Sequence, residues 1–132
     1  MISYSPKDYY NYRIRRAKET LLEVDILIQN KFWNTAINRL YYACFYAVGA
    51  LLVKNGIETS SHSGTRQKFG QLFIKTGKID KELGKHYSKL FEKRQKGDYT
   101  DFFDYDEETV IQFLPLSKKL ISEIELLILE DK

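Results

Sequence analysis

The chain has 132 residues, 43% of them hydrophobic and 30% charged, which is the size and composition of a single soluble globular domain. No apolar run approaches the roughly 20 residues of a membrane span, and the N-terminus lacks the apolar centre of a signal peptide. We therefore expect one cytoplasmic domain over residues 1–132, with its core at about 8–129, and neither a membrane protein nor a disordered chain.

Helical periodicity dominates the chain, and the first predicted helix runs from about Asp8 to Gln29. The second begins near Phe32 to Asn34 and continues to Lys54, after which Gly56 can adopt the left-handed conformation that ends a helix. The middle of this second helix, YYACFYAVGALLV, is apolar almost all round. We expect it to be the central, most buried helix, with a partner chain as a further candidate to cover it.

The next segments predict a loop and two helices. Residues 57–64, IETSSHSG, favour a loop, because their hydroxyl side chains compete with helical hydrogen bonds. A third helix is expected from about Thr65 to Lys75. Asp80 can cap a fourth helix, which we expect to end near Lys96.

The last predicted helix occupies most of the C-terminal quarter of the chain. Asp104 and Glu107 have the spacing of a capping box at its start, and Pro115 would kink it if the helix runs through that position. The sequence thus predicts an all-α fold, a compact five-helix bundle whose helices are mostly antiparallel.

Charge is unevenly distributed along the chain, although the net charge is only +3. Residues 66–97 carry ten Lys or Arg against three Asp or Glu, whereas residues 98–132 carry three against ten. A basic block can bind a polyanion such as RNA, but on helices it is also commonly a solvated face. Both interpretations stay open from the sequence.

Polar side chains interrupt the apolar second helix at Asn38 and Arg39, and Tyr42 follows at helical spacing. Buried polar and charged groups need partners, so these two residues either hydrogen-bond to other helices or a second subunit, or Arg39 helps to line an anion-binding cleft. Tyr41 and Tyr42 are expected to be aromatic residues of the core or of an interface.

The two histidines and the single cysteine give weaker signals. His62, in the predicted loop, is an exposed residue, a capping residue or a general base, whereas His86 is expected on the surface of the fourth helix. Cys44 lies in the apolar run and is expected in the core. Because no ligand pair has the spacing of a metal site, we expect neither a metal nor another cofactor.

The end of the fourth predicted helix reads RQKGDY. Arg94 and Asp98 are four residues apart, which suits an ordinary ion pair within a helix. Alternatively, Arg94 binds a phosphate through two hydrogen bonds, Asp98 holds its guanidinium in place, and Tyr99 supplies a hydroxyl or a stacking ring. The residues alone leave both alternatives open.

Three segments in this order, NRLYYACFYAVGALLVKNGIETSSHSG, FGQLFIKTGKID and FEKRQKGDY, resemble the HEPN domain, the higher eukaryotes and prokaryotes nucleotide-binding domain. The similarity covers about Tyr12 to Ile128 and points to a branch with N-R-x-Y-Y-A, H-x-G and R-x-x-x-D-Y motifs. It implies a helical bundle that forms a homodimer through its motif-bearing helices, with a shared cleft that contains the arginine of both subunits. Many HEPN proteins are metal-independent endoribonucleases, often toxins whose antitoxin partner is a minimal nucleotidyltransferase.

The usual HEPN site is R-x(4-6)-H, in which the arginine stabilises charge on the phosphate and the histidine assists proton transfer from the ribose 2′-hydroxyl. Here Arg94 matches the arginine, but Tyr99 stands five residues later and no histidine follows. Tyrosine is a poor base at neutral pH, because its ordinary pKa is about 10. The resemblance therefore leaves the role of base to His62, if its loop reaches the cleft, or to Tyr99.

Three functions follow from this resemblance. The first is a dimeric nucleotide- or RNA-binding component of a toxin–antitoxin or defence pair. The residues expected to bind are Asn38, Arg39, Tyr42, Arg94 and Asp98. The second is a metal-independent endoribonuclease toxin with a composite dimer site, which uses Arg94 with His62 or Tyr99. The third is a non-catalytic accessory partner of a nucleotidyltransferase, in which the cleft residues hold the dimer together and Arg94 and Asp98 form structural ion pairs. Separately, the resemblance implies that a nucleotidyltransferase partner would modify a motif tyrosine such as Tyr99.

Overall fold

The computed structural model describes residues 5–99 and 104–130, and for residues 97–99 it describes the backbone alone. The described chain forms five α-helices and one π-helical segment: α1 (Pro6–Gln29), α2 (Trp33–Lys54), α3 (His62–Phe69), η1 (Gly70–Ile74), α4 (Lys81–Tyr99) and α5 (Glu107–Leu129). No strand occurs in these ranges, and the predicted all-α fold with five helices is confirmed.

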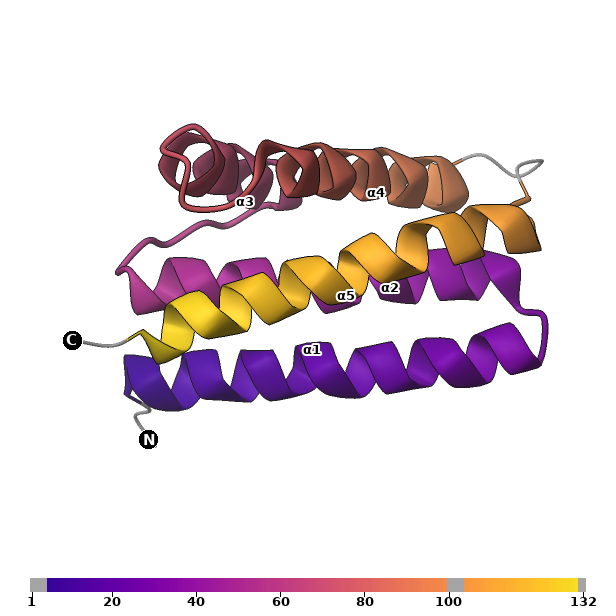
Figure 1. The fold of residues 1–132 in the computed structure, drawn as a ribbon, viewed down its shortest axis with the longest axis horizontal. Helices are drawn as coiled ribbons and strands as arrows, with labels where there is room; N and C mark the ends of the chain where they lie inside the picture. The colour runs from indigo at the N-terminus through magenta and orange to yellow at the C-terminus, as the bar shows by residue number, and fades with distance from the viewer. Residues whose placement is uncertain (1–4, 100–103, 131–132) are drawn as a thin grey trace.

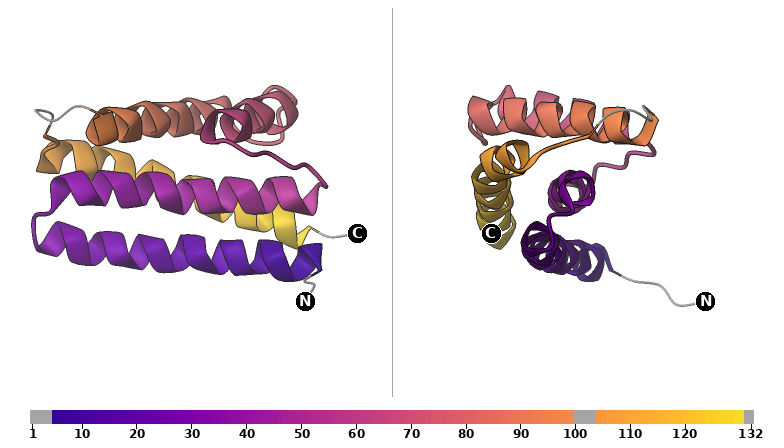
Figure 2. Two further views of the ribbon diagram at one scale, coloured as in Figure 1. Left: turned by 180° about the vertical axis from the view of Figure 1, so that it is seen from behind. Right: turned by 90° about the vertical axis from the view of Figure 1, so that its right-hand side faces the viewer.

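The four long helices lie roughly alongside one another, with α2 at the centre (Figure 1). α1 and α2 form an antiparallel pair, while α3, η1 and α4 make a layer on the other side of α2 (Figure 1). In the right panel of Figure 2, α5 lies along one side of α2, and none of the other described helices covers the opposite side. One face of the central helix therefore remains open.

Burial confirms that α2 is the core helix, since 11 of its 22 residues are buried. They share one apolar cluster with residues of all the other long helices, among them Val24, Leu90 and Ile124. By its length and mean hydropathy of 1.4, α2 also has the composition of a membrane span, which the sequence did not lead us to expect. The hydropathy refers to an 18-residue stretch of α2, and 61% of that stretch is buried inside the bundle. The core position therefore explains the apolar composition, which is weak evidence for a membrane span.

The start of α3 differs from the prediction, which placed residues 57–64 in a loop. The hydroxyl of Ser61 accepts a hydrogen bond from the backbone N–H of Gly64 at 2.9 Å, so Ser61 caps the helix. His62 consequently lies on the first helical turn. The predicted third helix is also divided, because α3 ends at Phe69 and the chain continues as the π-helical segment η1.

The cap of α5 also differs from the prediction. Asp106, not Asp104, accepts a hydrogen bond from the backbone N–H of Thr109 at 3.0 Å. Asp104 instead accepts one from the side-chain amide of Asn34 at the start of α2, also at 3.0 Å. The helix then runs through Pro115, which is exposed. Asp104 is thus engaged by Asn34, 70 residues earlier in the chain, and the carboxylate of Asp106 caps the helix.

The expectation that His86 is a surface residue was wrong, because its side chain is only 2% exposed. Its Nε2 lies 2.8 Å from the hydroxyl of Ser117 on α5, and its ring packs on Phe113 at 5.3 Å between centroids. Burial, with a smaller effect of Lys89, lowers the pKa of His86 to about 4. His86 is therefore a neutral histidine of the core at physiological pH.

Candidate functional site

The open side of α2 carries a stripe of half-buried residues at helical spacing, whereas most of the residues on its other sides are buried. The stripe consists of Asn38, Tyr42, Phe45, Tyr46, Gly49 and Val53. Three of these six residues are aromatic. The exposed face of the core helix is thus an aromatic surface, which we call the α2 face.

Arg94, from the last turns of α4, lies on the edge of the α2 face. Its guanidinium carbon is 5.4 Å from the ring centroid of Tyr41 and 5.7 Å from that of Tyr42. A guanidinium stacked on an aromatic ring is attracted to the ring face and donates hydrogen bonds through its edges. Stacking therefore orients Arg94 without competing with a bidentate contact to a phosphate.

His62, on the first turn of α3, packs on the same two tyrosines of α2. The Tyr41 hydroxyl lies 2.7 Å from Nδ1 of His62, and the ring centroids of His62 and Tyr42 are 5.8 Å apart. The Phe45 ring covers another side of the imidazole, with centroids 4.4 Å apart. The structure thus brings three of the predicted site residues, His62, Tyr42 and Arg94, together within one subunit.

The hydroxyl of Tyr41 contacts the His62 imidazole and stays protonated at neutral pH. Burial raises the pKa of Tyr41 to about 12, although the positive charge of Arg94 acts in the opposite direction. The hydroxyl and Nδ1 of His62 can exchange the roles of donor and acceptor, depending on the tautomer. When Nδ1 carries the proton and donates to Tyr41, Nε2 of the imidazole has a lone pair and can accept a proton.

Asn38 and Arg39 lie about one turn before Tyr42 on α2, and of the two only Arg39 has a ring contact with Tyr42. The Arg39 guanidinium carbon is 5.3 Å from the centroid of Tyr42, so the Tyr42 ring contacts two arginines. The Arg39 Nε is 3.9 Å from a carboxylate oxygen of Glu23 and buried without a hydrogen bond among the described residues. Asn38 is half-buried, and within residues 5–99 and 104–130 its amide makes no hydrogen bond.

The predictions for Asp98 and Tyr99 concern side chains that lie outside the described part of the structure. Their backbone belongs to the last turn of α4, four and five residues after Arg94. The helix therefore continues through Gly97, as an interaction between Arg94 and Asp98 at helical spacing would require.

Sequence reasoning missed three residues of this neighbourhood. Tyr41 was expected only as a core or interface aromatic, although its hydroxyl contacts His62. Arg66 stacks on Phe91 with its guanidinium carbon 4.3 Å from the ring centroid, and Phe91 in turn contacts Tyr41. Arg66 follows His62 by four residues, a helical spacing that the predicted loop concealed.

The third missed residue is Arg13 of α1, for which no motif gave a signal. Its guanidinium lies between the rings of Tyr9, Phe45 and Tyr46, with centroid distances of 5.7, 5.3 and 5.5 Å. It therefore extends the row of arginines on aromatic rings to the α1 side of the α2 face.

Cys44 is buried, and burial raises the pKa of its thiol to about 12, which disfavours the nucleophilic thiolate. Over the described residues, no three His, Cys, Asp or Glu side chains gather in the way a metal ion would need. The chemistry available at the α2 face is therefore that of arginines, tyrosines and one imidazole.

Comparison with known proteins yields one family. The profile of the HEPN domain family matches residues 10–127 of this chain. A "UPF0332 protein" of Thermotoga maritima is 43% identical over 117 residues, which cover 89% of each chain. "Putative toxin MJ0605" of Methanocaldococcus jannaschii is 33% identical over 84% of this chain and 87% of its own length. "Putative toxin MJ0142" of the same organism is 34% identical over 72% of this chain and 65% of its own length.

Proposed function

This chain belongs to the HEPN domain family, and on that premise we propose that it is a homodimeric RNA- or nucleotide-binding component of a toxin–antitoxin or defence system. Relatives named as toxins support the toxin-like part of this proposal. The observation that carries the binding function is the position of Arg94 on the rings of Tyr41 and Tyr42, beside His62.

In this proposal Arg94 binds a phosphate of the ligand through its guanidinium edge, and Asp98 orients it from the next helical turn. Arg39 supplies a second cation near Tyr42, and Asn38 offers an amide on the same α2 face. Tyr42 provides a half-exposed ring on which a base can stack. Binding thus combines a positive charge for the phosphate with an aromatic surface for the base.

The homodimer brings two copies of the α2 face together, so that each cleft contains the arginine of both subunits. Support comes from the open side of α2, which carries aromatic residues and has Arg13 and Arg94 on its edges, because aromatic residues and arginine are enriched in interface cores. A partner of the minimal nucleotidyltransferase type completes the system, and Tyr99 is the tyrosine that such a partner would modify. We place the pair in the cytoplasm, where RNA is available to it.

A second candidate function, a metal-independent endoribonuclease, is favoured by the position of His62. It lies with Arg94 on the rings of Tyr41 and Tyr42, and we call these four residues the Arg94 cluster. The ribose 2′-oxygen would attack the adjacent phosphorus while His62 takes its proton, and the bond to the 5′-oxygen of the next nucleotide would break. Arg94 would stabilise the negative charge that develops on the phosphate oxygens. After a proton is returned to the leaving oxygen, by Tyr99 or water, the products are a 2′,3′-cyclic phosphate and a 5′-hydroxyl.

The deciding experiment measures the solution mass of the protein and then its action on labelled structured RNA in EDTA. Wild type is compared with Arg94→Ala, His62→Ala and the matched control Lys85→Ala, which removes an exposed positive charge from the same helix. We expect a dimer that binds RNA, with about tenfold or greater loss of affinity in Arg94→Ala and little change in Lys85→Ala.

The outcomes separate the candidate functions. Cleavage by wild type that both Arg94→Ala and His62→Ala abolish, with cyclic phosphate ends, supports the endoribonuclease. RNA binding without cleavage supports the binding function alone. If Arg94→Ala lowers dimer stability but leaves RNA affinity unchanged, the protein is instead an accessory partner and Arg94 is structural.

A further inference from the structure

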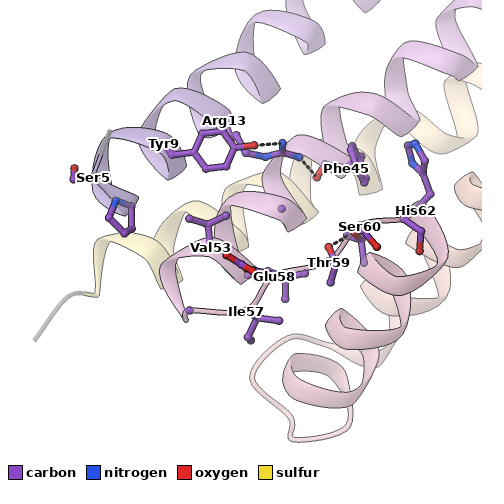
Figure 3. A pocket seen from close by; sticks show the side chains of 16 residues that line it. Ser5, Tyr9, Arg13, Phe45, Val53, Ile57, Glu58, Thr59, Ser60 and His62 are labelled. Atoms are coloured by element: carbon purple, nitrogen blue, oxygen red, sulfur yellow. Dashed lines mark hydrogen bonds between the residues drawn. The ribbon is translucent and has the colours of Figure 1, made fainter. Parts of the chain in front are cut away.

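A large cleft lies beside the α2 face, between the N-terminal half of α1, the C-terminal half of α2 and the segment that leads into α3 (Figure 3). Its volume is about 1210 Å³, which is ample for a nucleotide-sized ligand. Tyr9 and Arg13 line the cleft from α1, Val53 and Ile57 from the end of α2 and the residues after it, and Ser60 and His62 from the α3 side (Figure 3).

Arg13 is the cation of this cleft, and its guanidinium is held in place by three acceptors. Nη1 donates to the Tyr9 hydroxyl at 3.1 Å, while Nε and Nη2 donate at 3.4 Å to the backbone carbonyls of Tyr46 and Phe45. A guanidinium has five N–H donors, so two remain without an acceptor among the described residues. A half-buried arginine with fixed geometry and two remaining donors is suited to bind an anion.

Gly49 makes this position of Arg13 possible. A Cβ atom on Gly49 would lie 2.4 Å from Nη2, 2.7 Å from Nε and 2.8 Å from Cζ of Arg13. Any side chain at this position of α2 would therefore displace the guanidinium from the helix. The absence of a side chain at Gly49 lets a cation from α1 lie directly on α2, at the edge of the cleft.

The remaining lining matches the other parts of a nucleotide. Tyr9 is 45% exposed, so a base can stack on its ring, and half-buried Phe45, whose ring also contacts His62 and Arg13, adds apolar surface beside it. The Ser60 hydroxyl, which makes no hydrogen bond within the described part of the chain, is available to a ribose or phosphate oxygen. Glu58 is the one acidic residue that lines the cleft among those described, and it is exposed.

The cleft is continuous with the Arg94 cluster. His62 lines the cleft and also contacts Tyr41, on which Arg94 lies. Phe45 stands between the two sites, because its ring contacts both the His62 ring, at 4.4 Å, and the Arg13 guanidinium, at 5.3 Å. A ligand held by Arg94 can therefore extend past His62 to Arg13.

We propose that this cleft is a second binding site, in which Arg13 binds the phosphate of a nucleotide and Tyr9 and Phe45 bind its base. The inference rests on the proposed function, because it makes the cleft the place where a nucleotide next to the one at Arg94 is held. The ligand chemistry, a nucleoside phosphate, is shared by an RNA chain and a free nucleotide. The experiment therefore has one arm for each source.

The first arm titrates adenosine monophosphate into isotope-labelled protein and follows the backbone amide resonances of Gly49, Thr59 and Ser60. Wild type is compared with Arg13→Gln and with the matched control Arg15→Gln. Arg15 is an exposed arginine on the same helix, stacked on Tyr12 and outside the cleft lining. Gly49→Ala keeps the charge of Arg13 but displaces its guanidinium, so it serves as a second variant whose folding is checked by thermal unfolding.

We expect saturable shifts in wild type and Arg15→Gln, and at least tenfold weaker binding in Arg13→Gln and Gly49→Ala. The proposal is overturned if wild type shows no saturable shift at these amides, or if Arg13→Gln and Arg15→Gln bind equally well.

The second arm measures binding of a fluorescent oligoribonucleotide to Arg94→Ala and Arg13→Gln. Weaker binding in both variants supports an RNA chain that occupies both sites. If only Arg94→Ala weakens RNA binding, RNA does not occupy the cleft, and a positive first arm then makes it a site for free nucleotides. If the first arm is negative as well, the cleft proposal fails and the proposed function stands. If wild type does not bind the oligoribonucleotide but binds the monophosphate in the cleft, the proposed RNA binding is rejected and the cleft is a site for free nucleotides.

Discussion

The two histidines of the chain occupy opposite environments. His62 is half-exposed on the first turn of α3, whereas His86 is 2% exposed on α4 and hydrogen-bonded to Ser117. The Ser117 hydroxyl donates to the carbonyl of Phe113 at 2.8 Å, so its oxygen accepts from the Nε2–H of His86. Protonation of the other ring nitrogen would place a positive charge in the core.

This arrangement predicts a loss of stability in mild acid. The pKa of His86 is about 4 in the fold and about 6.5 in the unfolded chain, so the unfolded state binds the proton first as the pH falls. The contribution is fully present above about pH 6.5 and is lost as the pH falls toward 4. We expect the free energy of unfolding to decrease by about 2 kcal/mol between pH 7 and pH 5 from this residue.

Urea denaturation of wild type and His86→Gln at several pH values tests this prediction. Glutamine can still donate to Ser117 but does not titrate, so its unfolding free energy should change less over the same range. His62→Gln is the control, because its side chain is half-exposed. A pH dependence that persists unchanged in His86→Gln would assign the acid sensitivity to other groups.

At the scale of single residues, the sequence predicted Arg94, Tyr42 and His62 as neighbours only through resemblance to a family. Spacing alone could not place His62, because the rest of α3, η1, a turn and most of α4 separate it from Arg94. The environment of His86 was equally hidden. Its burial depends on Ser117, which lies 31 residues away and supplies the hydrogen bond that makes a histidine tolerable in the core.

At the scale of elements, Gly84 and Gly70 are two helical glycines with different surroundings. A Cβ on Gly84 would lie 2.9 to 3.0 Å from three side-chain carbons of Ile74, whereas one on Gly70 would meet nothing within 4 Å. Gly84 therefore allows η1 to pack closely on α4. Gly70 has a φ of −60°, which any residue adopts.

We expect opposite effects of alanine at these two positions. Gly70→Ala should stabilise the fold by about 0.5 to 1 kcal/mol, because it restricts the unfolded chain and adds no contact. Gly84→Ala should destabilise it by about 1 to 2 kcal/mol, because the clash with Ile74 outweighs the same gain. Paired urea denaturation curves test both. Stabilisation by Gly84→Ala would show that η1 moves away from α4 at little cost.

Helix interiors followed the sequence closely, but their ends did not always do so. The prediction for α1 and α2 is within two residues of the observed starts, because their apolar periodicity is strong. The start of α5 was misjudged because Asp104 and Asp106 are both suitable caps. Asn34 settles the choice, since its amide donates to Asp104 and its carbonyl oxygen accepts from the backbone N–H of Tyr105 at 2.6 Å.

At the scale of the whole molecule, the fold class was predictable and the arrangement of charge was not. The basic block at residues 66–97 lies on α3, η1 and α4, and most of its lysines are exposed. Only some of its cations lie on aromatic rings of the interior, among them Arg66 on Phe91 and Arg94 on Tyr41 and Tyr42. The block is therefore both a solvated face and a source of site residues, two interpretations that the sequence kept separate.

The open α2 face also bears on the oligomeric state of the molecule. Tyr42 and Tyr46 are half-buried on this face, with ring centroids 6.1 Å apart, and large aromatic residues beside arginines commonly dominate interface energies. We expect wild type to have a solution mass of twice 15.6 kDa at micromolar concentration. Tyr46→Ala should raise the dimer dissociation constant by about 30-fold, the effect of removing one interface residue that contributes about 2 kcal/mol.

Sedimentation at several protein concentrations measures this constant, with Tyr12→Ala as the control. Tyr12 is a 48% exposed tyrosine on α1, so its truncation removes a similar ring from a different surface. Equal effects of the two substitutions would place the interface elsewhere, and a monomeric wild type would rule out the composite cleft.

Because each cleft of the proposed dimer contains Arg94 from both subunits, a dimer weakened by Tyr46→Ala should also bind RNA less well at low protein concentration and recover its RNA binding at high concentration. Recovery with concentration distinguishes a lost interface from a lost ligand contact, since a missing contact weakens binding at every concentration.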